Sequence, residues 1–156
     1  NPLKRALKER GISYVFLGKE LGARSDDPTC YVDDKVQYRR LAATPAFRAG
    51  IERLIEGSAR ERIAIMCAEG EPLDCHRTIL VARELIAAGA QVAHILPDGS
   101  LELHAASVRR LMERLKMLQP AFLESPEGLE DRVYASQEDR IAYVRSAARA
   151  EGEEQA

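Results

Sequence analysis

Hydrophobic and polar residues follow two different periods along the chain. Short apolar runs rich in β-branched residues, typical of strands covered on both faces of a parallel sheet, span residues 12–18, 62–67 and 91–96. Apolar residues at helical spacing fill much of the remaining chain, at residues 2–10, 45–57, 75–88 and 103–118. Strands that alternate with helices at this spacing predict an α/β fold, with a mostly parallel sheet and flanking helices in three layers.

The C-terminal part of the chain adds a helical tail to this fold. Its core-facing residues recur at helical spacing: Val133, Gln137, Ile141 and Val144. We therefore divide the chain into an α/β domain at residues 1–118 and a C-terminal extension at residues 119–156, made of one amphipathic helix and a frayed end. The simpler interpretation is that this helix docks on the domain, and the alternative is that it docks on a second subunit in a homodimer.

The composition is that of a folded chain without a strong charge preference. Of the 156 residues, 46% are hydrophobic and 31% are charged, as in ordinary globular proteins. The 23 basic and 25 acidic residues give a net charge of −2, so we expect no overall attraction to nucleic acid or to an anionic membrane. No apolar run approaches the roughly 20 residues of a membrane-spanning helix. The odd number of cysteines favours a reducing compartment, and we expect a cytoplasmic protein.

The residues best suited to chemistry gather in the segment IAIMCAEGEPLDCHRTILVARELIAA, at residues 63–88. Cys67 ends a predicted strand, at the edge of a parallel sheet where ligands bind. Asp74 is a suitable N-cap for the next helix, which would place Cys75 in the first turn, among free N–H groups that favour a thiolate. Arg77 in the same turn opposes the helix dipole, which is easier to explain if an anion binds there.

Two histidines are candidates for a catalytic base. His76 directly follows Cys75, and His94 lies near the end of the third predicted strand, where it would approach Cys67 at the sheet edge. A histidine within reach of a thiol is the arrangement that activates nucleophilic cysteines. We therefore expect Cys75 or Cys67 as nucleophile and His94 or His76 as base. Packing in the core is the alternative interpretation of Cys67 and His94.

A metal site is the competing interpretation of these residues. Cys67, Cys75 and His76, with His94 or His104, would supply the nitrogen and sulfur ligands that zinc prefers. However, the gap between the cysteines is not the short spacing of common zinc modules, and adjacent residues of a helix, such as Cys75 and His76, point in different directions. We therefore predict no metal and no cofactor, and a Cys/His metal site stays as the alternative.

Arginines in a long predicted loop at residues 19–43 suggest another class of function. Arg24, Arg39 and Arg40 lie in this loop, and together with Arg77 they would suit a module that binds nucleotide or nucleic acid and has structural cysteines. The slightly acidic net charge makes nucleic acid the less favoured partner.

Four stretches of the chain carry a resemblance to a known family: GISYVFLGKELGAR, TPAFRAGIERL, IMCAEGEPLDCHRTILVARELIAAG and VAHILPDGSLELH. They resemble the bacterial family catalogued as domain of unknown function 488, and the resemblance covers roughly residues 2–118. It implies an α/β fold and an enzyme site with conserved cysteines in a Cys-x7-Cys-His-Arg segment, with no established reaction. Members of that family begin with further strands, so the resemblance also implies that this chain is N-terminally incomplete relative to the family.

Together these observations predict a cysteine-dependent enzyme, a hydrolase or transferase whose substrate is a small phosphate- or carboxylate-bearing molecule such as a nucleotide. The catalytic residues are expected to be Cys75, Cys67, His94 and His76. The anion-binding residues are expected to be Arg77, Arg24 and Glu69.

Overall fold

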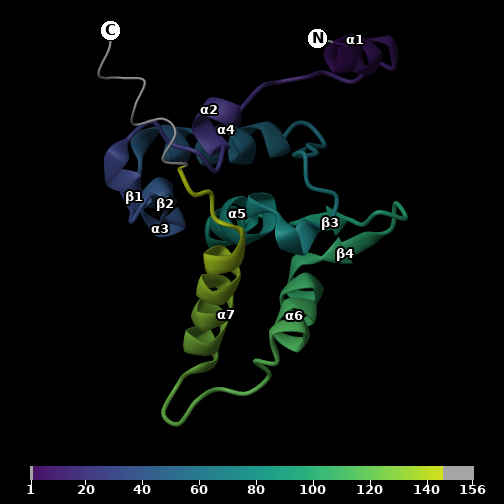
Figure 1. The fold of residues 1–156 in the computed structure, drawn as a ribbon. Helices are drawn as coiled ribbons and strands as arrows, with labels where there is room; N and C mark the ends of the chain where they lie inside the picture. Colours follow the sequence, from purple (N-terminus) through teal and green to yellow (C-terminus); the bar gives the residue numbers. More distant parts are fainter. Residues whose placement is uncertain (1, 146–156) are drawn as a thin grey trace, which may run out of the picture.

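The protein is mainly helical, and its computed structural model describes residues 2–145. The predicted frayed end lies outside these residues. The α-helices are α1 (Pro2–Glu9), α2 (Gly18–Leu21), α3 (Tyr38–Ala42), α4 (Pro45–Ser58), α5 (Arg83–Ala87), α6 (His104–Leu115) and α7 (Pro126–Ile141). Two 3-10 turns, η1 (Pro28–Cys30) and η2 (Pro72–Asp74), and a π-helix, η3 (Arg77–Ala82), lie between them. α1 has no buried residue and lies apart from the other helices (Figure 1).

The described strands form two antiparallel hairpins, so the predicted three-layer, mostly parallel sheet is wrong. One hairpin pairs β1 (Tyr31–Val32) with β2 (Lys35–Val36), and the other pairs β3 (Ala93–Ile95) with β4 (Leu101–Leu103). β3 falls within the third predicted strand. It pairs antiparallel because the chain reverses directly after it, at a turn in which Gly99 has φ of 83°.

The other two predicted strands do not belong to any sheet of the described chain. Residues 12–17 and 62–67 are neither helical nor paired, and their side chains are largely exposed, with Phe16 at 62% and Met66 at 59%. An apolar, β-branched run shows which side chains favour burial, but it does not show which backbone supplies the hydrogen bonds of a ladder. That missing information is the physical reason for the wrong fold class.

Capping residues set the starts of the two longest helices. Thr44 Oγ1 accepts a hydrogen bond from the backbone N–H of Phe47 at 3.3 Å, and Pro45 occupies the first helical position, as the sequence predicted for α4. Ser125 Oγ accepts from the N–H of Gly128 at 3.1 Å and begins α7 in the same way. A cap depends only on residues that are close in the sequence, so the predicted start of α4 is correct although the predicted sheet is wrong.

The core joins α2 to α4, which lie next to each other in Figure 1, and it also packs α7 against α6 and η3. Phe47 of α4 and Leu73 of η2 are almost completely buried within it. α2 approaches α4 so closely that a Cβ on Gly50 would lie 2.7 Å from Cδ2 of Leu21. This close approach fixes the position of the segment from Gly18 onward, which contributes to the candidate site.

The chain after α7 returns to the first hairpin. The N–H of Val36 donates to the carbonyl of Tyr143 at 2.9 Å, and Val144 forms a bridge with Lys35. Val144, which the sequence pattern placed on the tail helix, therefore lies beyond the end of α7. The side chains of Val133 and Gln137 in the same helix are fully buried.

Within residues 2–145, no helix combines the length and the hydrophobicity that crossing a membrane requires.

Candidate functional site

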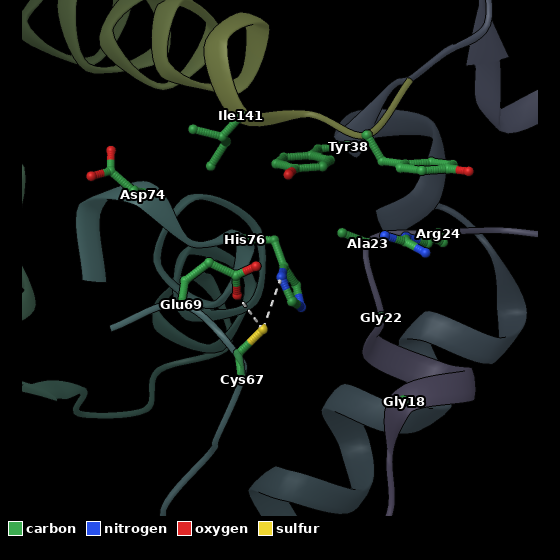
Figure 2. A pocket seen from close by; sticks show the side chains of 11 residues that line it. Gly18, Gly22, Ala23, Arg24, Tyr38, Cys67, Glu69, Asp74, His76 and Ile141 are labelled. Carbon is green, nitrogen blue, oxygen red and sulfur yellow. Dashed lines mark hydrogen bonds between the residues drawn. The ribbon is translucent and has the colours of Figure 1, made fainter. Parts of the chain in front are cut away.

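Four side chains from one short segment bring their reactive atoms together. These atoms of Cys67, Glu69, Cys75 and His76 all lie within 4.8 Å of one another. Cys67 Sγ donates a hydrogen bond to Glu69 Oε2 at 2.6 Å and lies 3.7 Å from Nδ1 of His76 (Figure 2). Cys75 Sγ lies 3.5 Å from the same glutamate oxygen and 3.9 Å from the same histidine nitrogen. We call these four residues the Cys/His cluster.

Cys75, rather than Asp74, supplies the side chain that accepts a backbone N–H at the start of the following helix. Cys75 is extended, with φ of −124° and ψ of 138°, and its sulfur accepts a hydrogen bond from the N–H of Arg77 at 3.4 Å. The prediction that Asp74 is the N-cap is wrong. The carboxylate of Asp74 instead binds Arg114 of α6 at 2.6 Å and Gln137 of α7 at 3.1 Å.

Helices α6 and α7 hold the turn that precedes Cys75. Glu71 begins this turn by accepting the N–H of Leu73 at 3.1 Å, and Arg110 of α6 donates to the same carboxylate oxygen at 3.0 Å. Gln137 of α7 donates to the carbonyl of Leu73 at 2.7 Å. The Cys/His cluster is therefore positioned by helices that lie far beyond it in the sequence.

The helix after the cluster begins as a π-helix, a geometry that the sequence pattern did not indicate. The first two hydrogen bonds run from the N–H groups of Thr78 and Ile79 to the carbonyl of Cys75, at 3.0 and 3.3 Å, with the spacing of 3-10 and α-helices. The wide turns of the π-helix cover Arg77–Ala82, before α5 begins. π-Helices are rare and are often found at functional sites.

Arg77 binds its own chain through all three guanidinium nitrogens. Nε donates to Cys75 Sγ at 3.0 Å, Nη1 donates to the carbonyl of Ile65 at 3.3 Å, and Nη2 donates to the carbonyl of Glu69 at 2.7 Å. The side chain thus connects the start of the helix to the segment that carries Cys67. The predicted role of Arg77 as an anion-binding group has less support than that of Arg24, because these internal contacts occupy its guanidinium.

Burial and hydrogen bonding shift the pKa values of three residues of the cluster. Burial raises the pKa of Cys67 to about 11, and the hydrogen bond to Glu69 adds to this increase. The same bond is the main cause of the lowered pKa of Glu69. Burial also lowers the pKa of His76, while Glu69 and a hydrogen bond to the backbone of Leu21 partly oppose this change. The resting site is therefore a thiol, a carboxylate and a neutral imidazole.

A cavity of about 390 Å³ opens onto one side of the cluster (Figure 2). Cys67, Glu69 and His76 line it, whereas Cys75 is only 1% exposed and does not. The other lining residues are Gly18, Gly22, Ala23, Arg24, Tyr38, Asp74, Ile141 and Tyr143. The guanidinium of Arg24 stacks 4.3 Å from the ring centroid of Tyr143.

The sequence analysis missed the aromatic part of this cavity. Tyr38 begins a short helix inside the predicted loop, and Tyr143 lies beyond the end of α7. Tyr38 directly precedes Arg39 and Arg40 in the sequence, and an aromatic residue beside arginines is a signal typical of nucleic-acid binding. Arg40 instead donates to the carbonyl of Thr29 at 3.0 Å, and neither Arg39 nor Arg40 lines the cavity.

His94 lies away from the predicted position beside Cys67. It belongs to a buried chain of hydrogen-bonding groups, in which Thr78 Oγ1 is 3.5 Å from His94, His94 is 2.9 Å from His104, and His104 is 2.7 Å from the hydroxyl of Tyr134. The prediction depended on parallel strands that the described chain does not contain. The buried position agrees with the packing interpretation of His94.

This histidine chain should make the protein less stable in acid. Burial lowers the pKa of His104 from 6.5 to about 4, and burial also lowers the pKa of His94. The unfolded chain therefore binds protons first, so stability is complete above pH 6.5 and falls as the pH drops towards 4. We expect a loss on the order of 2 kcal/mol in the free energy of unfolding, measured by urea titration across this range.

The matched variant for this prediction is His104→Gln, which keeps a polar side chain but cannot be protonated. Its free energy of unfolding should depend less steeply on pH than that of the wild type. An equally steep dependence in the variant would show that the acid loss has another source.

Comparison with known proteins gives one match. A family model described as domain of unknown function DUF488 matches residues 1–83, a stretch that contains the whole Cys/His cluster, Arg24 and Arg77. No curated protein and no solved structure matches the chain.

Proposed function

Since the chain belongs to the family described as domain of unknown function DUF488, a description that states no reaction, we propose a function from the site itself. The protein is a cysteine-dependent hydrolase or transferase, and its substrate is a small molecule that carries a phosphate or carboxylate group. Cys67 is the nucleophile, Glu69 and His76 handle its proton, and Arg24 binds the anionic group.

The cavity carries this proposal. A nucleophilic sulfur, a carboxylate, an imidazole and a cation line one space of about 390 Å³, which suits a small ligand. Tyr143 adds a ring against which a flat ligand can pack, and the almost completely buried Tyr38 forms part of the cavity wall. Of the two thiols that the sequence offers as nucleophile, Cys67 faces the cavity and Cys75 is buried, which favours Cys67.

The reaction divides into two balanced steps. The thiol of Cys67 passes its proton to Nδ1 of His76, whose protonated form the carboxylate of Glu69 stabilises. The sulfur forms a bond to the electrophilic carbon or phosphorus of the substrate, and the bond to the leaving group breaks. The leaving group departs with its electron pair and takes the proton from His76. Water, or an acceptor hydroxyl, then attacks the carbon or phosphorus of the thioester or thiophosphate intermediate, and the bond from that atom to sulfur breaks. The product leaves, and the proton of the attacking oxygen returns to the sulfur of Cys67.

Alkylation by two matched reagents tests this proposal without knowledge of the substrate. Metal-free protein is treated with iodoacetate, which is anionic, or with iodoacetamide, which is neutral, and peptide mass spectrometry locates the modified cysteine. We expect Cys67 to react first. Relative to a free cysteine peptide, the ratio of iodoacetate rate to iodoacetamide rate should rise roughly threefold to tenfold, because Arg24 attracts the anion.

Two arginine variants provide the control. Arg24→Gln should remove the preference for iodoacetate and leave the iodoacetamide rate nearly unchanged. Arg109→Gln changes an exposed arginine that does not line the cavity, so it should keep the preference. First reaction at Cys30 or Cys75, or an equal preference in the Arg24 variant, would contradict the proposal.

A further inference from the structure

We propose that the Cys/His cluster also binds one divalent zinc-like ion, and that metal occupancy switches off the thiol chemistry. The regulatory part of this inference rests on the function proposed above, whereas the binding part does not. The ligands are the sulfurs of Cys67 and Cys75, Nδ1 of His76 and a carboxylate oxygen of Glu69.

The spacing of these donors suits a tetrahedral ion. With bonds of about 2.3 Å to sulfur and about 2.0 Å to nitrogen or oxygen, a tetrahedral zinc site places its ligand atoms roughly 3.3 to 3.8 Å apart. The distances from Nδ1 of His76 to the two sulfurs are 3.7 and 3.9 Å. Cys75 Sγ lies 3.5 Å from Glu69 Oε2.

One distance must change when the ion binds. Cys67 Sγ and Glu69 Oε2 are 2.6 Å apart, closer than two ligand atoms of one tetrahedral ion can lie. A divalent ion displaces the protons of both thiols, so that two protons leave as two sulfur–metal bonds form. Glu69 is the exposed member of the cluster, and its side chain can move outward by the small distance that a shared ion requires.

Neighbouring groups support the ligands as they do in known metal sites. The backbone of Leu21 interacts with the ring of His76, whose Nδ1 faces the two sulfurs, and such partners outside the ligand set orient metal-bound histidines. Arg77 donates to Cys75 Sγ through both its backbone N–H and its Nε. Two thiolates, one carboxylate and a divalent cation carry one net negative charge, which the guanidinium of Arg77 balances.

The sequence argument against a metal assumed that Cys75 and His76 are adjacent residues of a helix. Cys75 is instead extended, and the helical geometry begins after it. The chain direction therefore changes between the two residues, and both side chains reach the same point. The seven-residue gap between the cysteines forms the loop and turn that bring Cys67 back to Cys75.

Metal binding has a direct consequence for the cavity. Cys67 is the nucleophile in the proposed reaction, and a sulfur bound to zinc shares electron density with the cation, which makes it a weaker nucleophile towards the substrate. The protein then alternates between a metal-free form with a reactive thiol and a metal-bound form in which the thiol is masked.

Cobalt and zinc titrations of the chelator-treated full chain test the binding. We expect one Co²⁺ per chain, with cobalt–thiolate charge-transfer absorption and the intense visible bands of tetrahedral cobalt, and displacement by one Zn²⁺. Competition with a chromophoric chelator measures the zinc affinity. Cys75→Ala should lower this affinity by at least about 100-fold, and Glu69→Gln by about tenfold. Cys30→Ala removes the cysteine outside the cluster and should leave the affinity unchanged.

Because Glu69 is exposed, Glu69→Gln should fold even if a cysteine variant does not, and its zinc affinity can still be measured. Absence of binding, or the same affinity in the Glu69 and Cys30 variants, would overturn the metal site and would leave the alkylation result for the metal-free protein untouched. Zinc should also slow the iodoacetamide reaction of Cys67 in proportion to occupancy. Stoichiometric binding with an unchanged alkylation rate would overturn the regulatory part.

Discussion

Replacing Phe47 by alanine is expected to lower the free energy of unfolding by about 4 kcal/mol, the largest effect of a single substitution that we predict. Phe47 lies one turn into α4, only 1% of its surface is exposed, and it belongs to the main core cluster. Removing the ring loses its transfer free energy and leaves a cavity between packed helices. Urea unfolding followed by circular dichroism measures the change.

The chain offers a matched control for this substitution. Phe122 is 94% exposed, so Phe122→Ala should change the free energy of unfolding by less than about 0.5 kcal/mol. Phe47→Leu keeps most of the apolar volume and should cost only about 1 kcal/mol. A loss below about 1 kcal/mol for Phe47→Ala would mean that the core does not depend on this ring.

The second large effect is expected at Gln137, a buried polar residue on α7. Gln137→Ala should destabilise the protein by about 3 kcal/mol, because the buried carbonyl of Leu73 loses its donor and a cavity forms in its place. The turn that holds Leu73 leads directly to Cys75. We therefore also expect faster modification of Cys75 by a neutral thiol reagent under native conditions, measured by mass spectrometry.

Two further variants separate the contributions of this residue. Gln137→Met fills the space but supplies no donor, so it should be more stable than Gln137→Ala. It also removes the buried Oε1 atom of Gln137, which has no hydrogen-bond partner among residues 2–145. Gln119→Ala changes an exposed glutamine and should have little effect. If Gln137→Ala exposed Cys75 no more than Gln119→Ala does, the proposed connection between α7 and the site would be wrong.

The local features of the fold were predictable, and the pairing of strands was not. Thr44 with Pro45 specifies the start of α4 through a cap that involves residues three positions apart. The apolar run at residues 62–67 carries no comparable signal for a partner. Strand pairing depends on which other backbone lies alongside, and this information is distributed over the whole sequence.

The same distinction explains which parts of the site could be predicted. Cys67 and His76 lie nine residues apart, so any compact turn between them brings them close. Arg24 joins them only through the packing of α2 on α4, and Tyr143 only through the return of the chain after α7. His94 was misplaced because its predicted position required two neighbouring parallel strands.

The π-helix at residues 77–82 gives this site a tolerance to changes in chain length. Each residue of an α-helix turns the chain by about 100°, and a π-helical turn accommodates an additional residue without rotating the segments on either side. Loss of one residue from this stretch would convert the wide turn into a regular one and leave Cys75 facing the same way relative to α5. α5 contains no wide turn, so a deletion within it would rotate the residues that follow by about 100° around the helix axis. Relatives that differ by one residue between Cys75 and Arg83 would therefore present the same cysteine orientation.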